Sequence, residues 1–289
     1  MAYSVAHVSV RKVKEGSHHT EPDLLAVEEP LEIRLGFGPQ HQRQERSLSV
    51  TMRTPGHDLE LAMGFLISEG IIQSAQDVLS IRHCQQVEKE EERGNVVRAQ
   101  LAYDLTVDLE KLQRHFYTTS SCGVCGKSSI EAVQLSNCYY LPPEQPVFAD
   151  ELIHKLPEKL REAQAVFEHT GGLHAAALFD KQGALVLMRE DVGRHNALDK
   201  LVGAAAAAGM LPLHKYLVQV SGRTSFELVQ KALMAGSPLL SAVGAPSSLA
   251  VKLAASAGMT LLGFVRNRRY NIYCGEQRIS MRENQQFIA

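Results

Sequence analysis

The chain has 289 residues, 45% of them hydrophobic, which is enough to bury a substantial core in one large domain or two unequal ones. With 30 basic and 32 acidic residues, the net charge is −2, so any anionic ligand needs a local basic cluster and global attraction for nucleic acid is excluded. The sequence shows no apolar leader and no run of about 20 apolar residues, and its five cysteines are an odd number. We therefore expect a cytoplasmic protein that binds neither nucleic acid nor membrane.

The first half of the chain is predicted to be rich in strands. Residues 1–25 are polar and unpatterned, and the sequence leaves open whether they are ordered. Apolar and polar residues alternate over 31–35 and 48–52, as in a half-buried hairpin. A helix follows, with Asp58 placed to accept the free amides of its first turn. Alternation over 97–109 predicts a strand that leads toward a loop with two cysteines.

The second half reads as alternating helices and strands. A helix is predicted over 150–169, where Pro157 should kink it or displace its start. Further along, we expect strands at 173–179, 184–188, 216–220, 239–243 and 260–264, and helices at 195–208, 226–235 and 249–257. This order predicts an α/β layer with a mainly parallel sheet. We divide the chain into a polar segment at 1–25, a β-rich portion with the cysteine loop at 26–145, and an α/β portion at 146–289.

The pair Cys122-Gly-Val-Cys125 lies in a polar, glycine-punctuated loop, where two thiols come within reach of each other. An accessible thiolate is a nucleophile, so the loop predicts sulfur chemistry. A structural zinc site would need a second cysteine pair or three isolated partners, and a thioredoxin-like couple normally opens a helix; both alternatives stay open. A phosphate-binding P-loop is excluded, because Ser121 occupies the position of its first glycine.

Anion-binding features follow the predicted strands. The loops 221–225 and 244–248 each offer glycine, hydroxyls and a helix start, which suit a pyrophosphate, although their serines could be ordinary helix caps. The basic run 264–269 could bind phosphate oxygens or simply be solvated. The segment opened by Asp191 and containing His195 leaves the same choice between function and structure.

Several ordered motifs together resemble the formate dehydrogenase accessory sulfurtransferase family, FdhD. The resemblance runs from about residue 49 to 273. Its motifs are Thr54-Pro-Gly-His-Asp-Leu-Glu-Leu-Ala-Met-Gly-Phe, Thr119-Ser-Ser-Cys-Gly-Val-Cys-Gly-Lys-Ser, Thr170-Gly-Gly-Leu-His-Ala-Ala, Glu190-Asp-Val-Gly-Arg-His-Asn-Ala-Leu-Asp-Lys, Val220-Ser-Gly-Arg-Thr-Ser, Gly244-Ala-Pro-Ser-Ser-Leu-Ala and Gly263-Phe-Val-Arg.

The resemblance implies a sulfur carrier that takes sulfur from a cysteine desulfurase as a cysteine persulfide. It passes that sulfur to the bis-molybdopterin guanine dinucleotide form of the molybdenum cofactor, a bound substrate that guanine nucleotides could mimic, before the cofactor enters the formate dehydrogenase apoenzyme. The implied fold is a cytidine deaminase-like three-layer αβα domain with a mixed sheet and a smaller N-terminal β-rich portion, in a homodimer with no permanent metal. The implied site residues are Cys122 and Cys125 for catalysis, and Ser221, Gly222, Arg223, Thr224, Phe264, Val265, Arg266, Asn267, Arg268, Arg269 and His195 for the cofactor.

Two further residues, Lys127 and His174, have expected roles in this chemistry, and His195 has a second one. Lys127 would lower the pKa of the neighbouring thiols, and His174 and His195 would carry protons. A zinc-dependent deaminase that uses His174 with both cysteines is disfavoured, because Ala176 replaces the glutamate that such enzymes need. The alternative to sulfur transfer is a cofactor-binding chaperone with a metal-binding or redox cysteine pair.

Overall fold

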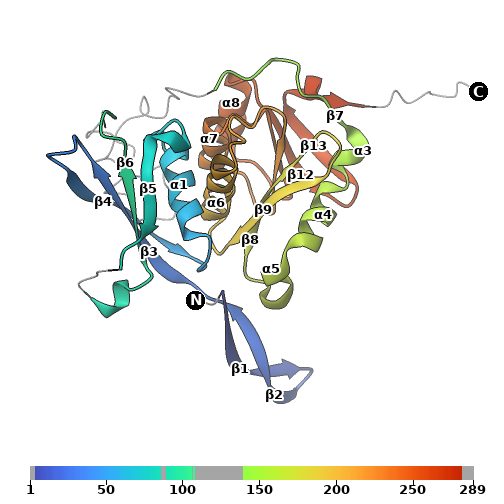
Figure 1. Cartoon of the computed structure of the whole chain (residues 1–289). Helices are drawn as coiled ribbons and strands as arrows, with labels where there is room; N and C mark the ends of the chain where they lie inside the picture. Colours follow the sequence, from blue (N-terminus) through green and yellow to red (C-terminus); the bar gives the residue numbers. More distant parts are fainter. Residues whose placement is uncertain (1–3, 86–88, 106, 108–138, 282–289) are drawn as a thin grey trace, which may run out of the picture. The chain divides into compact units, whose positions relative to one another are not determined.

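A computed structural model of the chain describes residues 4–85, 89–105, 107 and 139–281 (Figure 1). Cys122, Cys125 and Lys127 lie outside the described residues. The described residues group into two compact units. Unit 1 takes them from Met1–Asn137, Gln164–Ala176 and Arg189–Leu211, and unit 2 from Cys138–Ala163, Ala177–Met188 and Pro212–Ala289. This division differs from the expected boundary at 145, because later segments of the chain pack with the N-terminal part.

Unit 1 contains a four-stranded sheet in the order β4-β3-β6-β5. Its strands are β3 (Glu29–Phe37), β4 (Gln44–Arg53), β5 (Val78–His83) and β6 (Val96–Leu101). Strands β3 and β4 pair antiparallel, which confirms the predicted hairpin, and β3 pairs parallel with β6. The alternating residues Leu31, Ile33 and Leu35 are buried. Strand β6 ends well before residue 109, because the chain turns at Tyr103 and Asp104.

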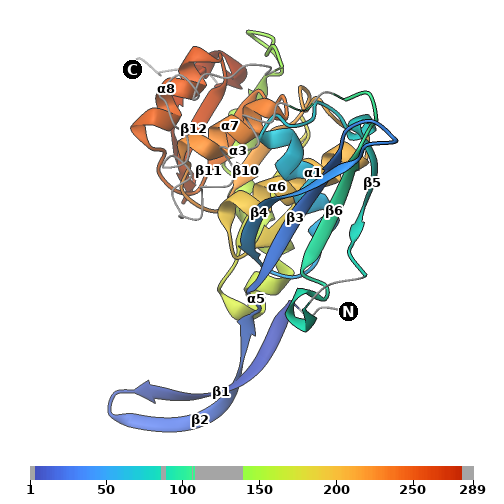
Figure 2. The ribbon, with the colours of Figure 1, turned by 90° about the vertical axis from the view of Figure 1, so that its left-hand side faces the viewer.

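Helix α1 (Asp58–Ser68) contacts β5 and β6 of this sheet and packs against α6 (Arg194–Ala207), as Figure 2 shows. The two helices cross where each has a glycine. A Cβ atom on Gly64 would lie 1.8 Å from the Asp199 carbonyl oxygen, and one on Gly203 would lie 1.9 Å from the Glu60 carbonyl oxygen. The crossing is therefore a contact between backbones that no side chain could enter.

Asp58 does not cap α1, contrary to the prediction. His57 occupies the N-cap position, and the Asp58 carboxylate instead accepts hydrogen bonds from Arg53 Nε and Nη2, both at 3.0 Å. Arg53 is 1% exposed, so its guanidinium needs a buried counter-charge. The two-bond pairing with Asp58 satisfies that need and outweighs capping.

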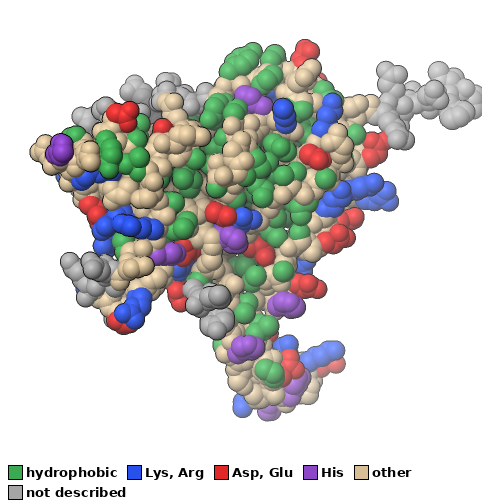
Figure 3. Space-filling view, in the orientation of Figure 1, with side chains coloured by type: hydrophobic (Ala, Val, Ile, Leu, Met, Phe, Trp, Pro, Cys, Tyr) green, Lys and Arg blue, Asp and Glu red, His purple; other side chains and the backbone are tan. Residues whose placement is uncertain are grey.

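The N-terminal polar segment forms an ordered ribbon. Strands β1 (Val5–Lys14) and β2 (Ser17–Ala26) pair antiparallel from Val5↔Ala26 to Lys14↔Ser17. Figure 3 shows charged and histidine side chains on this ribbon beside a few hydrophobic ones, and helix α5 (Ala165–Thr170) contacts β2. A lone two-stranded ribbon is only marginally stable, so ion pairs between its strands help to hold them together. One such pair joins Lys12 Nζ to Glu21 Oε1 at 2.5 Å.

Unit 2 is built on the six-stranded sheet β13-β12-β11-β10-β8-β9, whose last two strands continue into unit 1. Strands β10, β11 and β12 are parallel and β13 is antiparallel, so the sheet is mixed and the α/β class is confirmed. Helices α7 and α8 connect the parallel strands (Figure 1). The bounds are β8 His174–Phe179, β9 Leu185–Asp191, β10 Leu217–Val220, α7 Phe226–Met234, β11 Leu239–Ala242, α8 Ser248–Ser256, β12 Thr260–Arg266 and β13 Arg269–Cys274.

The predicted helix at 150–169 is divided into three. Helices α3 (Asp150–Ile153) and α4 (Leu156–Ala163) precede α5, and Pro157 is the second residue of α4, where its missing amide costs no hydrogen bond. Within the described residues, no helix is long and apolar enough to cross a membrane. The short elements are the strands β7 (Phe148–Ala149) and β14 (Ile279–Ser280) and the 3-10 helices η1 (Ala75–Asp77), η2 (Glu90–Glu92) and η5 (Glu276–Arg278).

Candidate functional site

Three loops of unit 2 meet at the carboxyl ends of β10, β11 and β12, and we call residues 221–225, 244–247 and 264–269 the strand-end loops. Backbone hydrogen bonds tie the first two together, from Gly244 N to Gly222 O at 3.0 Å and from Thr224 N to Ala245 O at 3.0 Å. The third joins them through Phe264 N, which donates to Gly244 O at 3.0 Å. Such a strand edge is the usual ligand-binding side of an open α/β sheet.

Two helices begin at these loops and direct free amides toward the same edge of the sheet. Ser225 is the N-cap of α7, and Ser247 is the N-cap of α8. Ser247 Oγ accepts a hydrogen bond from Ala250 N at 3.2 Å, so this serine is an ordinary cap. The capping alternative is confirmed for Ser247, and the remaining amides of both first turns retain a partial positive charge.

The third strand-end loop is a basic turn with unusual backbone angles. Asn267 and Arg268 have φ angles of 53° and 56°, as a two-residue hairpin turn requires, and Arg266 pairs with Arg269 across it. Phe264 also has a positive φ, 54°, at a register shift in β12. The Arg266 guanidinium lies 5.7 Å from the centre of the Phe264 ring, close enough for a cation–π contact.

The predicted cofactor-binding residues of unit 2 differ in what they present. The side chains of Arg223, Arg266, Asn267, Arg268 and Arg269 are exposed, and Ser221, Gly222 and Phe264 are half-buried. In contrast, Val265 is fully buried and Thr224 is 1% exposed. Their side chains therefore contribute to packing, and a ligand at the surface would meet the arginines first.

A second strand-to-helix junction, between β9 and α6 in unit 1, is filled by a buried ion pair. Lys200 Nζ lies 2.6 Å from Asp191 Oδ2, with the two side chains 1% and 0% exposed. The Asp191 carboxylate also accepts hydrogen bonds from the amides of Thr54 at 3.2 Å and Gly193 at 2.8 Å and from Asn196 Nδ2 at 3.2 Å. Lys200 also donates to Thr54 O at 2.8 Å. The network therefore joins the sequence motif that begins at Thr54 to the motif that contains Asp191 and Lys200.

Three basic residues surround the same junction. His174 begins β8, and Arg194 and His195 begin α6; all three are half-buried. Burial lowers the pKa of His174, the charges of Arg194 and His195 lower it further, and Asp191 opposes them. A neutral His174 at pH 7 fits the proton-carrier prediction, which stays a prediction. Arg194 belongs to the same sequence motif as Asp191 and His195, but the sequence predicted no separate role for it.

No metal centre is built from the residues described. In that part of the chain, His, Cys, Asp and Glu side chains do not gather in a group of three that could hold an ion. Ala176, which replaces the glutamate of a deaminase, is fully buried in β8. The predicted catalytic residues Cys122 and Cys125 lie outside the described residues, so the arrangement around their sulfur atoms stays a prediction.

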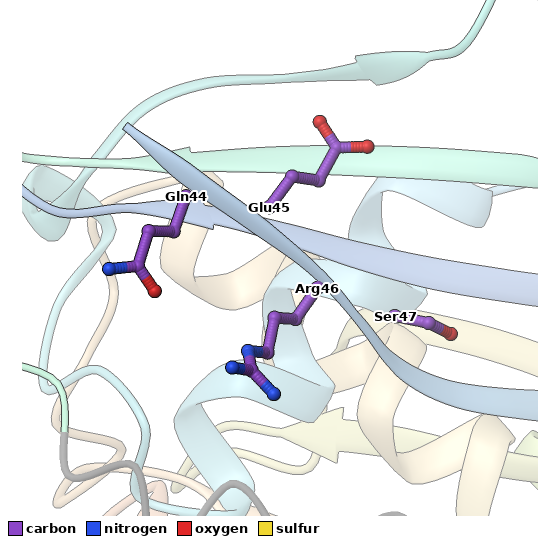
Figure 4. Close-up of a pocket in the computed structure, with 4 residues that line it drawn as sticks. All are labelled: Gln44, Glu45, Arg46 and Ser47. Atoms are coloured by element: carbon purple, nitrogen blue, oxygen red, sulfur yellow. The ribbon is translucent and has the colours of Figure 1, made fainter. Parts of the chain in front are cut away.

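A surface hollow of about 540 Å³ lies over β4, lined by Gln44, Glu45, Arg46 and Ser47 (Figure 4). The Gln44 and Arg46 side chains point to one side of the strand, and that of Glu45 points to the other. Glu45 Oε2 is 2.9 Å from Arg98 Nε. Because its polar groups diverge, the hollow offers no focused binding geometry and adds nothing to the site.

Comparison with known proteins places the sequence motifs in one family. The model of the FdhD/NarQ family matches residues 26–280. The chain is 50% identical over 275 residues to the sulfur carrier protein FdhD of Streptomyces avermitilis, covering 94% of this chain and 95% of that protein. It is 46% identical over 284 residues to the protein of the same name from Mycobacterium tuberculosis, covering 97% and 100%.

The fold has a counterpart among solved structures. A protein from Desulfotalea psychrophila, assigned as a formate dehydrogenase accessory protein, superposes with a TM-score of 0.75 at 22% identity. The match covers 96% of this chain and 100% of that one. At this identity the likeness supports the mixed α/β fold, while the sequence comparisons carry the family assignment.

Proposed function

The chain belongs to the FdhD/NarQ family, and on that basis we propose that it is a sulfur carrier for formate dehydrogenase. It takes sulfur from a cysteine desulfurase as a persulfide on Cys122, with Cys125 as its helper or alternate, and transfers it to the molybdenum cofactor. The observation that carries the proposal is the 50% identity to a sulfur carrier protein over 94% of the chain. The Cys122-Gly-Val-Cys125 sequence supplies the chemistry.

The thiol pair gives a balanced route for sulfur. In the first step, the Cys122 thiolate attacks the terminal sulfur of the desulfurase persulfide, forming a new S–S bond and releasing the desulfurase thiolate. In the second, the Cys125 thiolate attacks Cys122 Sγ, and the terminal sulfur leaves as hydrosulfide while the two cysteines become a disulfide. The two electrons for sulfide release come from the cysteines, so the pair must be reduced before the next cycle.

The strand-end loops are suited to hold the bis-molybdopterin guanine dinucleotide substrate. This substrate carries pyrophosphates and guanines, and arginine side chains match phosphate oxygens in geometry and charge. Arg223, Arg266 and Arg269 would bind phosphates, together with the first-turn amides of α7 and α8. Phe264 offers a ring face beside Arg266 for a guanine base. The proposal includes a homodimer and delivery to the formate dehydrogenase apoenzyme.

Mass spectrometry after incubation with a cysteine desulfurase and cysteine tests the proposal. We expect a reducible adduct of one sulfur atom on the loop peptide of the wild type, lost in Cys122→Ala. Cys84, a free thiol after β5, provides the matched control, and Cys84→Ala should keep the adduct. Active desulfurase with no sulfur adduct on any wild-type cysteine would contradict sulfur carriage. Bound zinc in the same sample would favour the metal-binding chaperone instead.

A further inference from the structure

The buried network at the junction of β9 and α6 does not explain the basic residues beside it. Asp191, the carboxylate nearest in sequence, is fully engaged: Oδ1 accepts from Gly193 N and Asn196 Nδ2, and Oδ2 from Thr54 N and Lys200. Its charge is matched by that of Lys200 at 2.6 Å. The counter-charge for Arg194 must therefore come from another group.

Arg194 has no such group among the residues that the structure describes. Its Nε atom is buried without a hydrogen-bond acceptor there, although a buried guanidinium nitrogen normally has one. The other carboxylate of this segment, Glu190, accepts from the amides of Val166 at 3.2 Å and Phe167 at 3.0 Å and so serves the start of α5. A half-buried arginine without an acceptor indicates that an anion completes the environment.

Two further features favour an anion at the same place. His174 lies near Arg194 and His195, since their charges lower its pKa after the effect of burial. It begins β8, the neighbour of β9 in the sheet, so the start of β8 and the end of β9 share one edge. Helix α6 also begins here, with Gly193 as an N-cap that has no side chain to accept from the first-turn amides.

From these observations we infer that His174, Arg194, His195 and the first turn of α6 form a binding site for a phosphate-type oxyanion. Arginine supplies a planar pair of donors, the helix supplies amides, and the imidazole rings of His174 and His195 supply further N–H donors. The inference deepens the proposed function, since His195 is among the residues expected to hold the cofactor. Its ligand class is a phosphate or pyrophosphate group, held in unit 1 by residues distinct from the strand-end loops.

Titration of the full-length protein with inorganic pyrophosphate tests this site. NMR of the histidine rings should show saturable binding that raises the pKa of His174, because a bound anion favours the imidazolium. In Arg194→Gln, we expect the pyrophosphate affinity measured by calorimetry to fall at least tenfold. Arg194→Lys should recover part of the loss, and Arg82→Gln, an exposed arginine on β5, should lose none.

The outcomes separate the sources of the anion and the two proposals. If inorganic phosphate binds as tightly as pyrophosphate, the ligand of the site is a single phosphate group. If GDP binds more tightly than either, the ligand is a nucleotide. Each result supports the site, provided that Arg194→Gln weakens the binding. Absence of a saturable His174 response in the folded wild type, or equal losses in Arg194→Gln and Arg82→Gln, would overturn the inference. Pyrophosphate binding by a wild type that forms no persulfide would retain this site while refuting the proposed function.

Discussion

Two kinds of strand-to-helix junction in this protein differ in whether a buried carboxylate is present. The junction between β9 and α6 contains a carboxylate, Asp191, that takes up the neighbouring amides and the charge of Lys200 in a buried network. The strand-end loops contain no Asp or Glu and are joined by backbone hydrogen bonds, which leaves exposed arginines at the carboxyl ends of the strands. The Asp191 carboxylate thus makes a structural joint with Lys200 and the amides of Thr54 and Gly193, and leaves only Arg194, the histidines and the first turn of α6 to an anion, whereas the strand-end loops contain no such carboxylate.

The largest expected effect is a loss of stability when the junction between β9 and α6 loses the positive charge of Lys200. Replacing Lys200 by Met leaves Asp191 buried without its counter-charge, and we expect a loss of about 3–5 kcal/mol in the free energy of unfolding. Urea denaturation measures this change. Lys181→Met, at an exposed lysine, is the matched control and should change stability by less than about 0.5 kcal/mol. Equal unfolding midpoints for the two variants would show that the Asp191–Lys200 pair is not a structural joint.

Substitutions in the strand-end loops should have the opposite result: they should weaken ligand binding and leave the stability of the fold unchanged. Changing Arg266 and Arg269 together to Ala removes two exposed guanidinium groups, and we expect GDP affinity to fall about 10-fold to 100-fold, corresponding to about 1.5–3 kcal/mol. Calorimetric titration measures the affinity, and the melting temperature should stay at the wild-type value. A double variant with Arg82→Ala and Lys181→Ala removes the same charge elsewhere. If that control loses as much affinity, the loops hold no specific phosphate contact.

The smallest expected effect concerns acid stability within unit 1. Burial raises the pKa of Glu60, but hydrogen bonds from Arg189 and His57 more than offset this and bring it to about 2. Since the ordinary value is 4.5, the unfolded chain takes up the proton first, and the contribution of Glu60 is present above about pH 5 and lost toward pH 2. Glu60→Gln should flatten that part of the stability profile by at most about 1 kcal/mol. Denaturant unfolding at a series of pH values, with Glu168→Gln as control, gives the comparison.

Most of the secondary structure was predictable because the period of the apolar residues and the punctuation by glycine are local signals. The strands and helices from β8 to β12 follow the expected order, and α1 begins where Asp58 indicated. The role of Asp58 was not predictable, since its pairing with Arg53 depends on how deeply that arginine is buried. The ribbon of β1 and β2 escaped detection because both of its faces are largely polar and exposed.

For the site, sequence alone indicated the strand-end loops correctly as neighbours but could not separate donors from packing residues. Val265 and Arg266 are adjacent in the chain, yet one is buried and the other exposed, because successive strand residues face opposite sides. The Asp191–Lys200 pair depends on the contact of α6 with the residues before α1, far away in sequence. The role of Arg194 could not be predicted, because it depends on the pairing of the nearby carboxylates, Asp191 and Glu190, with other groups.

The glycine crossing of α1 and α6 has a consequence for ligand entry. Because Gly64 and Gly203 bring the helix backbones into direct contact, α6 cannot slide or turn along α1 without a collision between main chains. The contact therefore holds the backbone of α6, which begins with Arg194 and His195, against that of α1. An anion that reaches this helix end therefore meets first-turn amides whose positions the helix contact already sets, so its binding loses little free energy to ordering of the backbone.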